Sequence, residues 1–344
     1  MKLPVRILLW VLCAVMILLA PFVISSPQIL DDAQWEIKDQ LDAESGSFLF
    51  PFIQTACAES EWEDAAPAYE LPIDRSPGMK PNPAKFTEDS YEDESISVRM
   101  ETIEENKRLQ WRVAWVNIAS PTQLRTNFYS TSKKTDQENI RNNKGYGFVT
   151  KMAAENNAIV AMNGSAFTRD AKLHSFEVRM GIVREKKPNN KVDILIIDEK
   201  GDFHVFVKSE GAATFEKDTG HQIVNAFMFG PALVKDGQVL AIPQKYANYA
   251  STGNNPRAAI GQIDELTYVM VIADYVKIRD KEGATLQELA DFMGRIGCTQ
   301  AYNLDGGNSA ILVFNNQVYN RKAQERDVND LIYFATAVPE EEWN

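Results

Sequence analysis

The alternation of apolar and polar positions that is typical of half-buried strands begins near Ile96. "ISVRMETI" (96–103) and "LQWRVAWVNI" (109–118) both follow it. Downstream, short apolar runs bounded by turn residues predict further strands, in the order "AIVAM", "KVDILIID", "DFHVFV", "VNAFMF" and "RAAIGQ". "GFVTKMAAENN" (147–157) has helical character instead.

The segment from Leu266 to Asp305 predicts a β-α-β unit. "LTYVMVIAD" is a strand that ends in Asp274, and "CTQAYNLD" is a strand that ends in Asp305. Between them, Thr285 and Glu288 form a T-x-x-E capping box at the start of an amphipathic helix. If the two strands run parallel in one sheet, both aspartates emerge at its carboxyl-terminal edge, where active sites of such units lie.

These elements predict an α+β fold in which mixed sheets pack with helices in a single catalytic domain, 96–338. The region 26–95 is acidic, contains several prolines and has little periodicity, so we expect a linker. An acidic tail, 339–344, follows the domain.

The N-terminus, 1–25, predicts export. Lys2 and Arg6 precede an apolar run from Ile7 to Ile24 that only Pro21 interrupts. Its length fits a signal peptide or an uncleaved anchor in the inner membrane, and both place the domain outside the cytoplasm, periplasmic or secreted.

Charge and the rarer residues exclude some functions. The 48 acidic residues exceed the 36 basic ones and no basic block stands out, which argues against nucleic acid as a partner. The three histidines have no ligand spacing, and only His174, which follows "NGSAF", is a pocket candidate. Cys57 and Cys298 are the thiols of the exported part, so one disulfide is possible.

The stretch "YNLDGGNSA" has two compatible interpretations. Asp305-Gly306 is a turn signal, and the turn could close a hairpin with the strand "ILVF". Alternatively, the Gly306 and Gly307 amides bind an anion, Asp305 serves as acid or base, and Asn308 and Ser309 lie beside it.

Two other polar groups lie next to apolar strands. "NGSAF", which starts at Asn163 and Gly164, is a type I′ turn, a glycan sequon or part of a site. Arg257 in "NNPRAAIGQ" is a surface residue, or a guanidinium that reaches bidentately to phosphate or carboxylate in a cleft.

Taken together, "NGSAF", "FGPALVKDG", "NPRAAIGQ", "VIAD…GATLQELADFMGRIGCTQAYNLDGGNSA" and "ERDVNDLIYF" resemble, in order and spacing, the phosphodiester glycosidase family. The resemblance spans roughly Trp111 to Ala337 and implies hydrolysis of a sugar-1-phosphodiester in a glycan or exopolysaccharide pathway, without a cofactor. It places these residues at the family's characteristic positions: Asn163, Gly164, Gly230, Pro231, Arg257, Gly261, Asp274, Asp305, Gly306, Gly307 and Arg326.

The chain departs from the family's pattern at three places. The usual NGGFF is "NGSAF", Tyr275 replaces the glycine of Asp-Gly-Arg after Asp274, and Asn308 replaces the third glycine of DGGG. These changes alter the residues around the expected pocket.

We expect Arg257 and the Gly306 and Gly307 amides to hold the phosphate and Asn163 to bind the sugar. Asp305 or Asp274 would activate water or attack the anomeric carbon, with Asp305 favoured. Two alternatives remain: a non-catalytic glycan-binding or assembly protein on the same scaffold, and a phosphodiesterase in which Asp274 and Asp305 ligate a divalent metal.

Overall fold

The computed structural model describes residues 72–129, 145–165, 175–187, 189–246, 249–250, 252–276, 283–320 and 325–343. All of them belong to one compact unit, Ala66–Asn344.

The apolar N-terminal segment and Cys57, for which the sequence predicted export and a possible disulfide, lie outside the described residues. Within them, no helix is both long and apolar enough to span a bilayer, and Cys298 is a buried free thiol.

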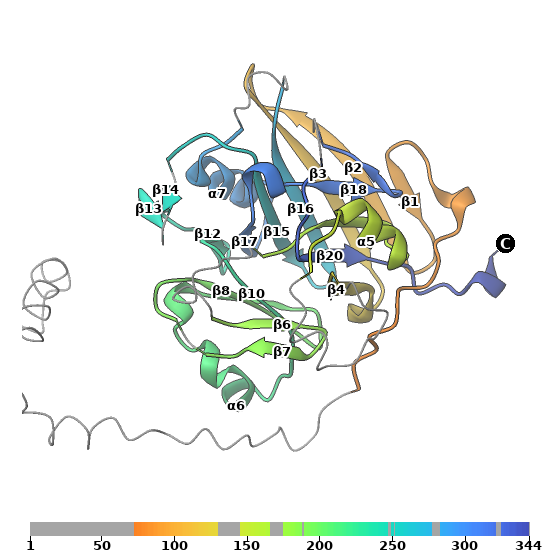
Figure 1. Cartoon of the computed structure of the whole chain (residues 1–344), viewed down its shortest axis with the longest axis horizontal. Coiled ribbons are helices and arrows are strands. Elements are labelled where there is room, and N and C mark those ends of the chain that lie inside the picture. The colour runs from red at the N-terminus through yellow and green to blue at the C-terminus, as the bar shows by residue number, and fades with distance from the viewer. Residues whose placement is uncertain are drawn as a thin grey trace, which may run out of the picture. The chain divides into compact units, whose positions relative to one another are not determined.

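An eight-stranded sheet forms one layer of the fold (Figure 1). In spatial order its strands are β1 (Ser90–Glu92), β2 (Ile96–Glu104), β3 (Leu109–Ile118), β16 (Thr267–Tyr275), β15 (Arg257–Asp264), β17 (Gln300–Leu304), β11 (Ala232–Lys235) and β12 (Gln238–Val239). Every neighbouring pair is antiparallel.

Two five-stranded antiparallel sheets accompany it. One has the order β19 (Gln317–Val318), β18 (Leu312–Phe314), β5 (Val160–Asn163), β20 (Asp330–Phe334) and β4 (Leu124–Phe128). The other has the order β7 (Ile182–Glu185), β6 (Glu177–Arg179), β10 (Ile223–Met228), β8 (Ile194–Asp198) and β9 (Phe203–Phe206). A short ribbon pairs β13 (Lys245–Tyr246) with β14 (Tyr249–Ala250). The expectation of mixed sheets was therefore wrong for the described strands, because all their pairings are antiparallel.

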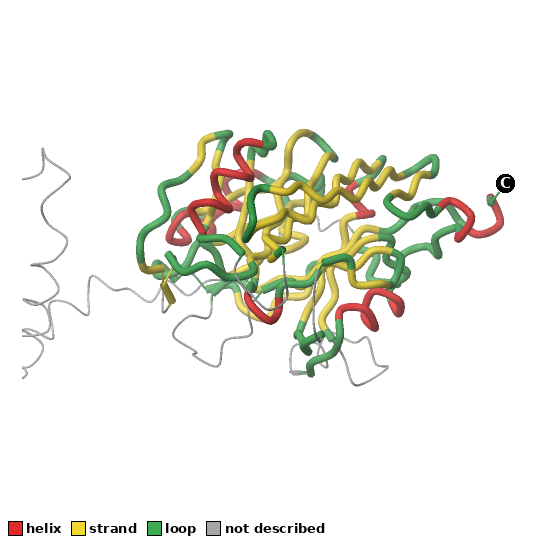
Figure 2. The backbone as a smooth tube through the Cα atoms, turned by 90° about the horizontal axis from the view of Figure 1, so that it is seen from above, coloured by secondary structure: helices red, strands yellow, loops and turns green. Residues whose placement is uncertain are grey.

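The helices are few and short beside these sheets (Figure 2). They are α5 (Val149–Glu155), α6 (Phe215–Thr219) and α7 (Leu286–Arg295). Single 3₁₀ turns complete the described elements: η2 (Pro83–Lys85), η3 (Pro121–Gln123), η5 (Val207–Ser209), η6 (Ala212–Thr214), η7 (Gly307–Ser309) and η8 (Glu340–Glu342).

The eight-stranded sheet buries both of its faces, as β16 illustrates. Tyr268 and Ile272 face a core shared with the two five-stranded sheets, whereas Val269 and Val271 face α7. On that second face Phe292 of α7 stacks on Trp111 of β3, with ring centroids 4.1 Å apart. The predicted capping box is present, since Thr285 Oγ1 accepts from the Glu288 amide and Glu288 accepts from the Thr285 amide.

The expected β-α-β unit is confirmed, because its two strands, β16 and β17, lie in one sheet and run in the same direction. Strand β15 lies between β16 and β17 and is antiparallel to both, so β16 and β17 run the same way. Asp274 and Asp305 therefore reach the same edge of one sheet, about 10 Å apart at two strand spacings. The start of β15, at Arg257, lies at this edge between them.

The folded unit begins before Ile96, so the expected linker is too long. Strand β1 pairs with β2, and the Gly78 amide donates to the Asn156 carbonyl. Further upstream, Asp74 accepts from Arg125 at 2.9 Å. At the other end, η8 in the expected acidic tail approaches this segment through the Lys80–Glu340 ion pair at 3.2 Å.

Candidate active site

The Asp305–Ala310 loop carries the chain from one sheet to another. It begins after β17 of the eight-stranded sheet, includes η7 and leads into β18 of a five-stranded sheet. The hairpin interpretation was therefore wrong, because β17 and β18 do not pair. Instead, the turn places Asp305 where two layers of the fold meet.

Asn163, the last residue of β5, holds both ends of this loop. Its Nδ2 donates to the Asp305 carbonyl at 2.7 Å, and its Oδ1 accepts from the Ile311 amide at 3.1 Å. The Asp305 amide donates to the Gly164 carbonyl at 3.2 Å. With Asn163 only 1% exposed, the sequon interpretation is excluded for the folded chain, and its side chain shapes the loop.

Asp305 is half-buried, and groups of both charges act on its carboxyl. Burial raises the pKa of its carboxyl, and the negative charge of Asp330 adds to the rise. A hydrogen bond from Ser309, the charge of Arg326 and the Gly306 amide act in the opposite direction. The balance leaves the pKa above its usual range, which makes the ionised carboxylate a stronger base than an exposed aspartate.

The glycine amides after Asp305 do not form an open anion site. The Gly307 amide donates to the Pro256 carbonyl at 2.7 Å, and the Gly306 amide lies beside the Asp305 carboxyl, whose pKa it lowers. A Cβ at Gly306 would lie 2.7 Å from the Pro256 carbonyl oxygen, so this position requires glycine. The glycines here provide close packing of the loop on β15, rather than an open anion cradle.

Arg257 is buried beneath the same loop. Its Nε donates to the Ala284 carbonyl at 3.1 Å and its Nη2 to the Gly253 carbonyl at 2.7 Å. The guanidinium thus joins the segments before β15 and α7. By contrast Arg326 is exposed, and its Nη1 lies 3.4 Å from Ser309 Oγ, beside the Asp305 carboxyl.

Asp274 emerges at the same edge but is fully buried, at 1% exposure. Its Oδ2 accepts from Arg112 Nε of β3 at 3.2 Å, and its Oδ1 accepts from the Tyr275 amide at 2.9 Å. Its carboxylate is therefore directed to the β3 side, away from β17, and is balanced by a guanidinium. The side chain of Tyr275 is itself buried, at 8% exposure.

A buried ion pair that the sequence did not predict lies near the loop, since the charge of Asp330 acts on the Asp305 carboxyl. Arg179 of β6 binds Asp330 of β20 through Nε at 3.0 Å, and both residues are at most 1% exposed. Ser165 joins them, because its amide donates to Asp330 and its Oγ accepts from Arg179 at 3.1 Å. Among the described atoms Asp330 Oδ1 has no hydrogen-bond partner. The run "FEVRMGIV" carries two charged residues, Glu177 and Arg179, and its sequence does not show that Arg179 is the buried one.

The remaining predicted residues lie in different places. Gly230 and Pro231 lie beside β17, since Asn303 donates to both of their carbonyls, from Nδ2 at 2.6 Å and from its amide at 3.1 Å. Asn308 is exposed on the Asp305 loop. His174 lies outside the described residues.

Comparisons with known proteins identify the family of the chain and its fold. The family model described as "Phosphodiester glycosidase" matches residues 156–335, which include the Asn163, Arg257, Asp274, Asp305 and Arg326 blocks. No curated protein matches the chain in sequence.

Two solved structures share the fold at low identity. A hypothetical protein from Synechocystis has a TM-score of 0.50 and 16% identity, over 70% of this chain and 62% of that one. The zebrafish N-acetylglucosamine-1-phosphodiester alpha-N-acetylglucosaminidase catalytic domain, auto-inhibited by its pro-peptide, has a TM-score of 0.50 and 15% identity, over 75% of this chain and 87% of that one. This chain thus spans less than two thirds of the Synechocystis structure. With the family model covering more than half of its length, the chain belongs to the phosphodiester glycosidase family.

Proposed function

We propose that this chain hydrolyses a sugar-1-phosphodiester, releasing a free sugar and a phosphomonoester, with Asp305 as the direct participant. The observation that carries the proposal is the Asp305 carboxyl itself, half-buried at the junction of two sheets, with a raised pKa and a cation, Arg326, beside it. The family to which the chain belongs supports the same class of reaction.

The chemistry requires little acid catalysis. The leaving group is a phosphomonoester whose relevant pKa is about 6, so it departs near neutral pH without strong protonation. Asp305 accepts a proton from water while the water oxygen attacks the anomeric carbon and the bond to the phosphate oxygen breaks. The electron pair of that bond leaves with the phosphate, whose charge Arg326 stabilises.

The other candidate residues act through the loop in this proposal. Asn163 fixes the Asp305 carbonyl and the Ile311 amide, and Arg257 fixes the backbone beneath Gly306. Both are therefore positioning residues rather than direct sugar or phosphate ligands. Asp274, which is paired with Arg112, shapes the same sheet edge.

The test is a panel of sugar-1-phosphodiesters, with free sugar and free phosphate measured separately to show which bond is cleaved. Asp305→Asn and Arg326→Ala should each lower kcat/KM at least about a hundredfold. Arg99→Ala, which removes an exposed arginine of β2 paired with Glu101, is the matched control and should leave turnover unchanged. Near-normal turnover in folded Asp305→Asn would remove Asp305 from the mechanism.

One observation favours the second candidate, a glycan-binding protein without turnover. The Gly307 amide donates to the Pro256 carbonyl and the Gly306 amide lies beside the Asp305 carboxyl, so the two amides do not form an open anion site in this structure. The same panel separates the two functions, because micromolar binding of oligosaccharides with no release of sugar or phosphate would support binding alone.

We place this activity outside the cytoplasm, in a glycan or exopolysaccharide pathway, on the strength of the apolar N-terminal segment. Protease digestion of spheroplasts, whose outer membrane has been opened, tests the location of a domain that stays with the cell. An exported domain is degraded while the inner membrane is intact, whereas a cytoplasmic one survives until that membrane is lysed. A secreted domain is found in the culture medium instead.

A further inference from the structure

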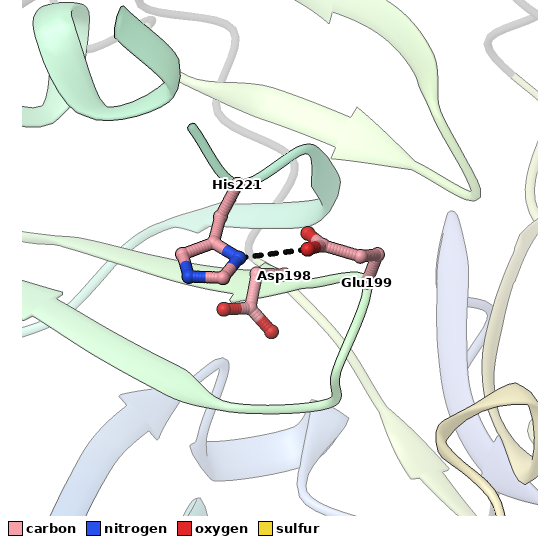
Figure 3. A group of neighbouring side chains, drawn as sticks. All are labelled: Asp198, Glu199 and His221. Atoms are coloured by element: carbon pink, nitrogen blue, oxygen red, sulfur yellow. Dashed lines mark hydrogen bonds and ion pairs between the residues drawn. The ribbon is translucent and has the colours of Figure 1, made fainter. Parts of the chain in front are cut away.

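A cluster of histidine and carboxylate side chains lies at the turn between β8 and β9. Asp198 ends β8, Glu199 follows it, and His221 lies between α6 and β10. One oxygen of each carboxylate and one ring nitrogen of His221 all lie within 4.8 Å of one another (Figure 3). His204 of β9 adds a second imidazole, with Nε2 2.9 Å from Asp198 Oδ2. Two of the chain's three histidines are therefore gathered at one turn.

Backbone amides hold both carboxylates in place without a bound ion. Asp198 Oδ1 accepts from the Lys200 and Asp202 amides at 2.9 and 3.0 Å, which orients it across the turn. Glu199 Oε2 accepts from the Gln222 amide at 2.7 Å, while its Oε1 faces His221 Nδ1 at 2.7 Å. Figure 3 shows the three side chains of Asp198, Glu199 and His221 converging from two separate segments.

The cluster is also open to an ion from solvent. The side chain of Asp198 is 1% exposed, but those of Glu199 and His221 are 17% and 28% exposed. Two carboxylates held this close repel each other when both are ionised, and a neighbouring cation relieves that repulsion. A divalent ion bound between the two carboxylates would supply two positive charges.

We propose that Asp198, Glu199 and His221 form a binding site for a divalent transition-metal ion, best represented by Zn²⁺. A mixed set of imidazole and carboxylate donors favours Zn²⁺ over Mg²⁺ and Ca²⁺, which prefer oxygen donors alone. His204, whose Nε2 lies 2.9 Å from Asp198 Oδ2, orients the Asp198 carboxylate from outside the proposed set of three ligands.

The ion has a structural role in this proposal, independent of the proposed hydrolysis. Gln262, at the end of β15 opposite to Arg257, accepts from the Phe203 amide just beyond the β8–β9 turn. The cluster therefore lies toward the sheet edge opposite to Asp305. An ion there would connect β8 to the segment before β10, which is 22 residues further along the chain.

The experiment uses the purified full chain, stripped with a chelator and titrated with ZnCl₂ in competition with a chromophoric chelator. We expect one equivalent of Zn²⁺ bound at micromolar affinity or tighter, and binding of Mg²⁺ and Ca²⁺ at least a hundredfold weaker. His221→Gln and Glu199→Gln should each weaken Zn²⁺ binding at least tenfold. Asp236→Asn, an acid at a turn outside the cluster that is bonded to Gln300, is the matched control and should leave the affinity unchanged.

The ion should also raise the melting temperature of the wild type, because it binds only the folded state, and the increase should disappear in both cluster variants. Circular dichroism checks that the variants are folded. Failure of the wild type to bind Zn²⁺, or an affinity unchanged in either folded variant, would overturn the three-residue site.

Discussion

Ionisation of Asp305 costs the folded state free energy, because burial is the main reason that its pKa is raised. A carboxyl with a raised pKa in the folded state binds its proton more tightly there than in the unfolded chain. The folded state therefore loses stability as the pH rises from the unfolded value, about 3.9, through the folded one. A residue that is useful as a base is destabilising at neutral pH.

We predict that Asp305→Asn, expected to be inactive, unfolds at a higher temperature than the wild type at pH 7. The gain should shrink as the pH falls and vanish below about pH 3.9, where the carboxyl is protonated in both states.

Asp93→Asn is the control, because its effect on stability at pH 7 should have the opposite sign. Burial raises the pKa of Asp93, but hydrogen bonds from Thr336 and Ser95 outweigh burial and lower it, so this variant should lose stability at pH 7. Unfolding midpoints across pH 3 to 7 measure both, and a destabilised Asp305→Asn at pH 7 would contradict the prediction.

The sequence could indicate Asp305 but not all of its neighbours. Asp305 stands beside two glycines at a strand end, a local pattern that can be read from nine residues. The Arg179–Asp330 pair joins residues 151 positions apart on strands of different sheets, and no local pattern encodes such a contact. The sequence allowed Arg257 to be either a surface residue or a phosphate ligand. The structure shows that it is buried and that its guanidinium donates to backbone carbonyls, a role that no local pattern indicates.

At the scale of elements, the start of α7 could be predicted to the residue, because the T-x-x-E capping box is a local sequence signal. Thr285 Oγ1 accepts from the Glu288 amide at 3.1 Å, and the apolar face that follows packs on the eight-stranded sheet. The strands beside it were predicted from their periodicity, but not their pairing. Strand β15 pairs with β16 on one side and with β17 on the other. The apolar pattern of a strand shows which face is buried, but it does not show with which other strand it pairs.

We predict that Thr285→Ala destabilises the protein by about 1 kcal/mol, within the range of about 0.5–2 kcal/mol for the loss of a helix cap. Urea unfolding followed by circular dichroism measures the change. Thr214→Ala provides the control, since Thr214 occupies the same position before α6 but makes no capping hydrogen bond there. It should change stability by less than about 0.5 kcal/mol. Equal effects of the two substitutions would show that the capping bond contributes nothing.

At the scale of the molecule, composition misled the sequence analysis at the N-terminal boundary. The stretch before Ile96 is acidic and rich in turn residues, so it resembles a linker, yet residues 72–95 pack on the fold. Gly78 explains the wrong boundary. A Cβ at this position would lie 2.2 Å from the Ala335 side chain, so the glycine is needed for close packing on the domain and does not indicate a mobile linker. Periodicity detects strands, and it does not detect an irregular segment that lies on a domain.

Truncation at the N-terminal boundary should destabilise the domain. A chain that begins at Tyr91 lacks Asp74 and Ser76, which accept hydrogen bonds from Arg125, and leaves that buried guanidinium without those acceptors. Hydrogen bonds to charged groups contribute about 1.5–3 kcal/mol each, so we expect fragment 91–344 to be at least about 3 kcal/mol less stable than fragment 66–344. Urea midpoints of the purified fragments measure the difference. Fragment 72–344 serves as the control, because it keeps all of these contacts and should match fragment 66–344. If the fragment from Tyr91 unfolds at the same urea concentration as the longer two, residues 72–90 are a linker after all, and the domain begins where strand periodicity alone would place it.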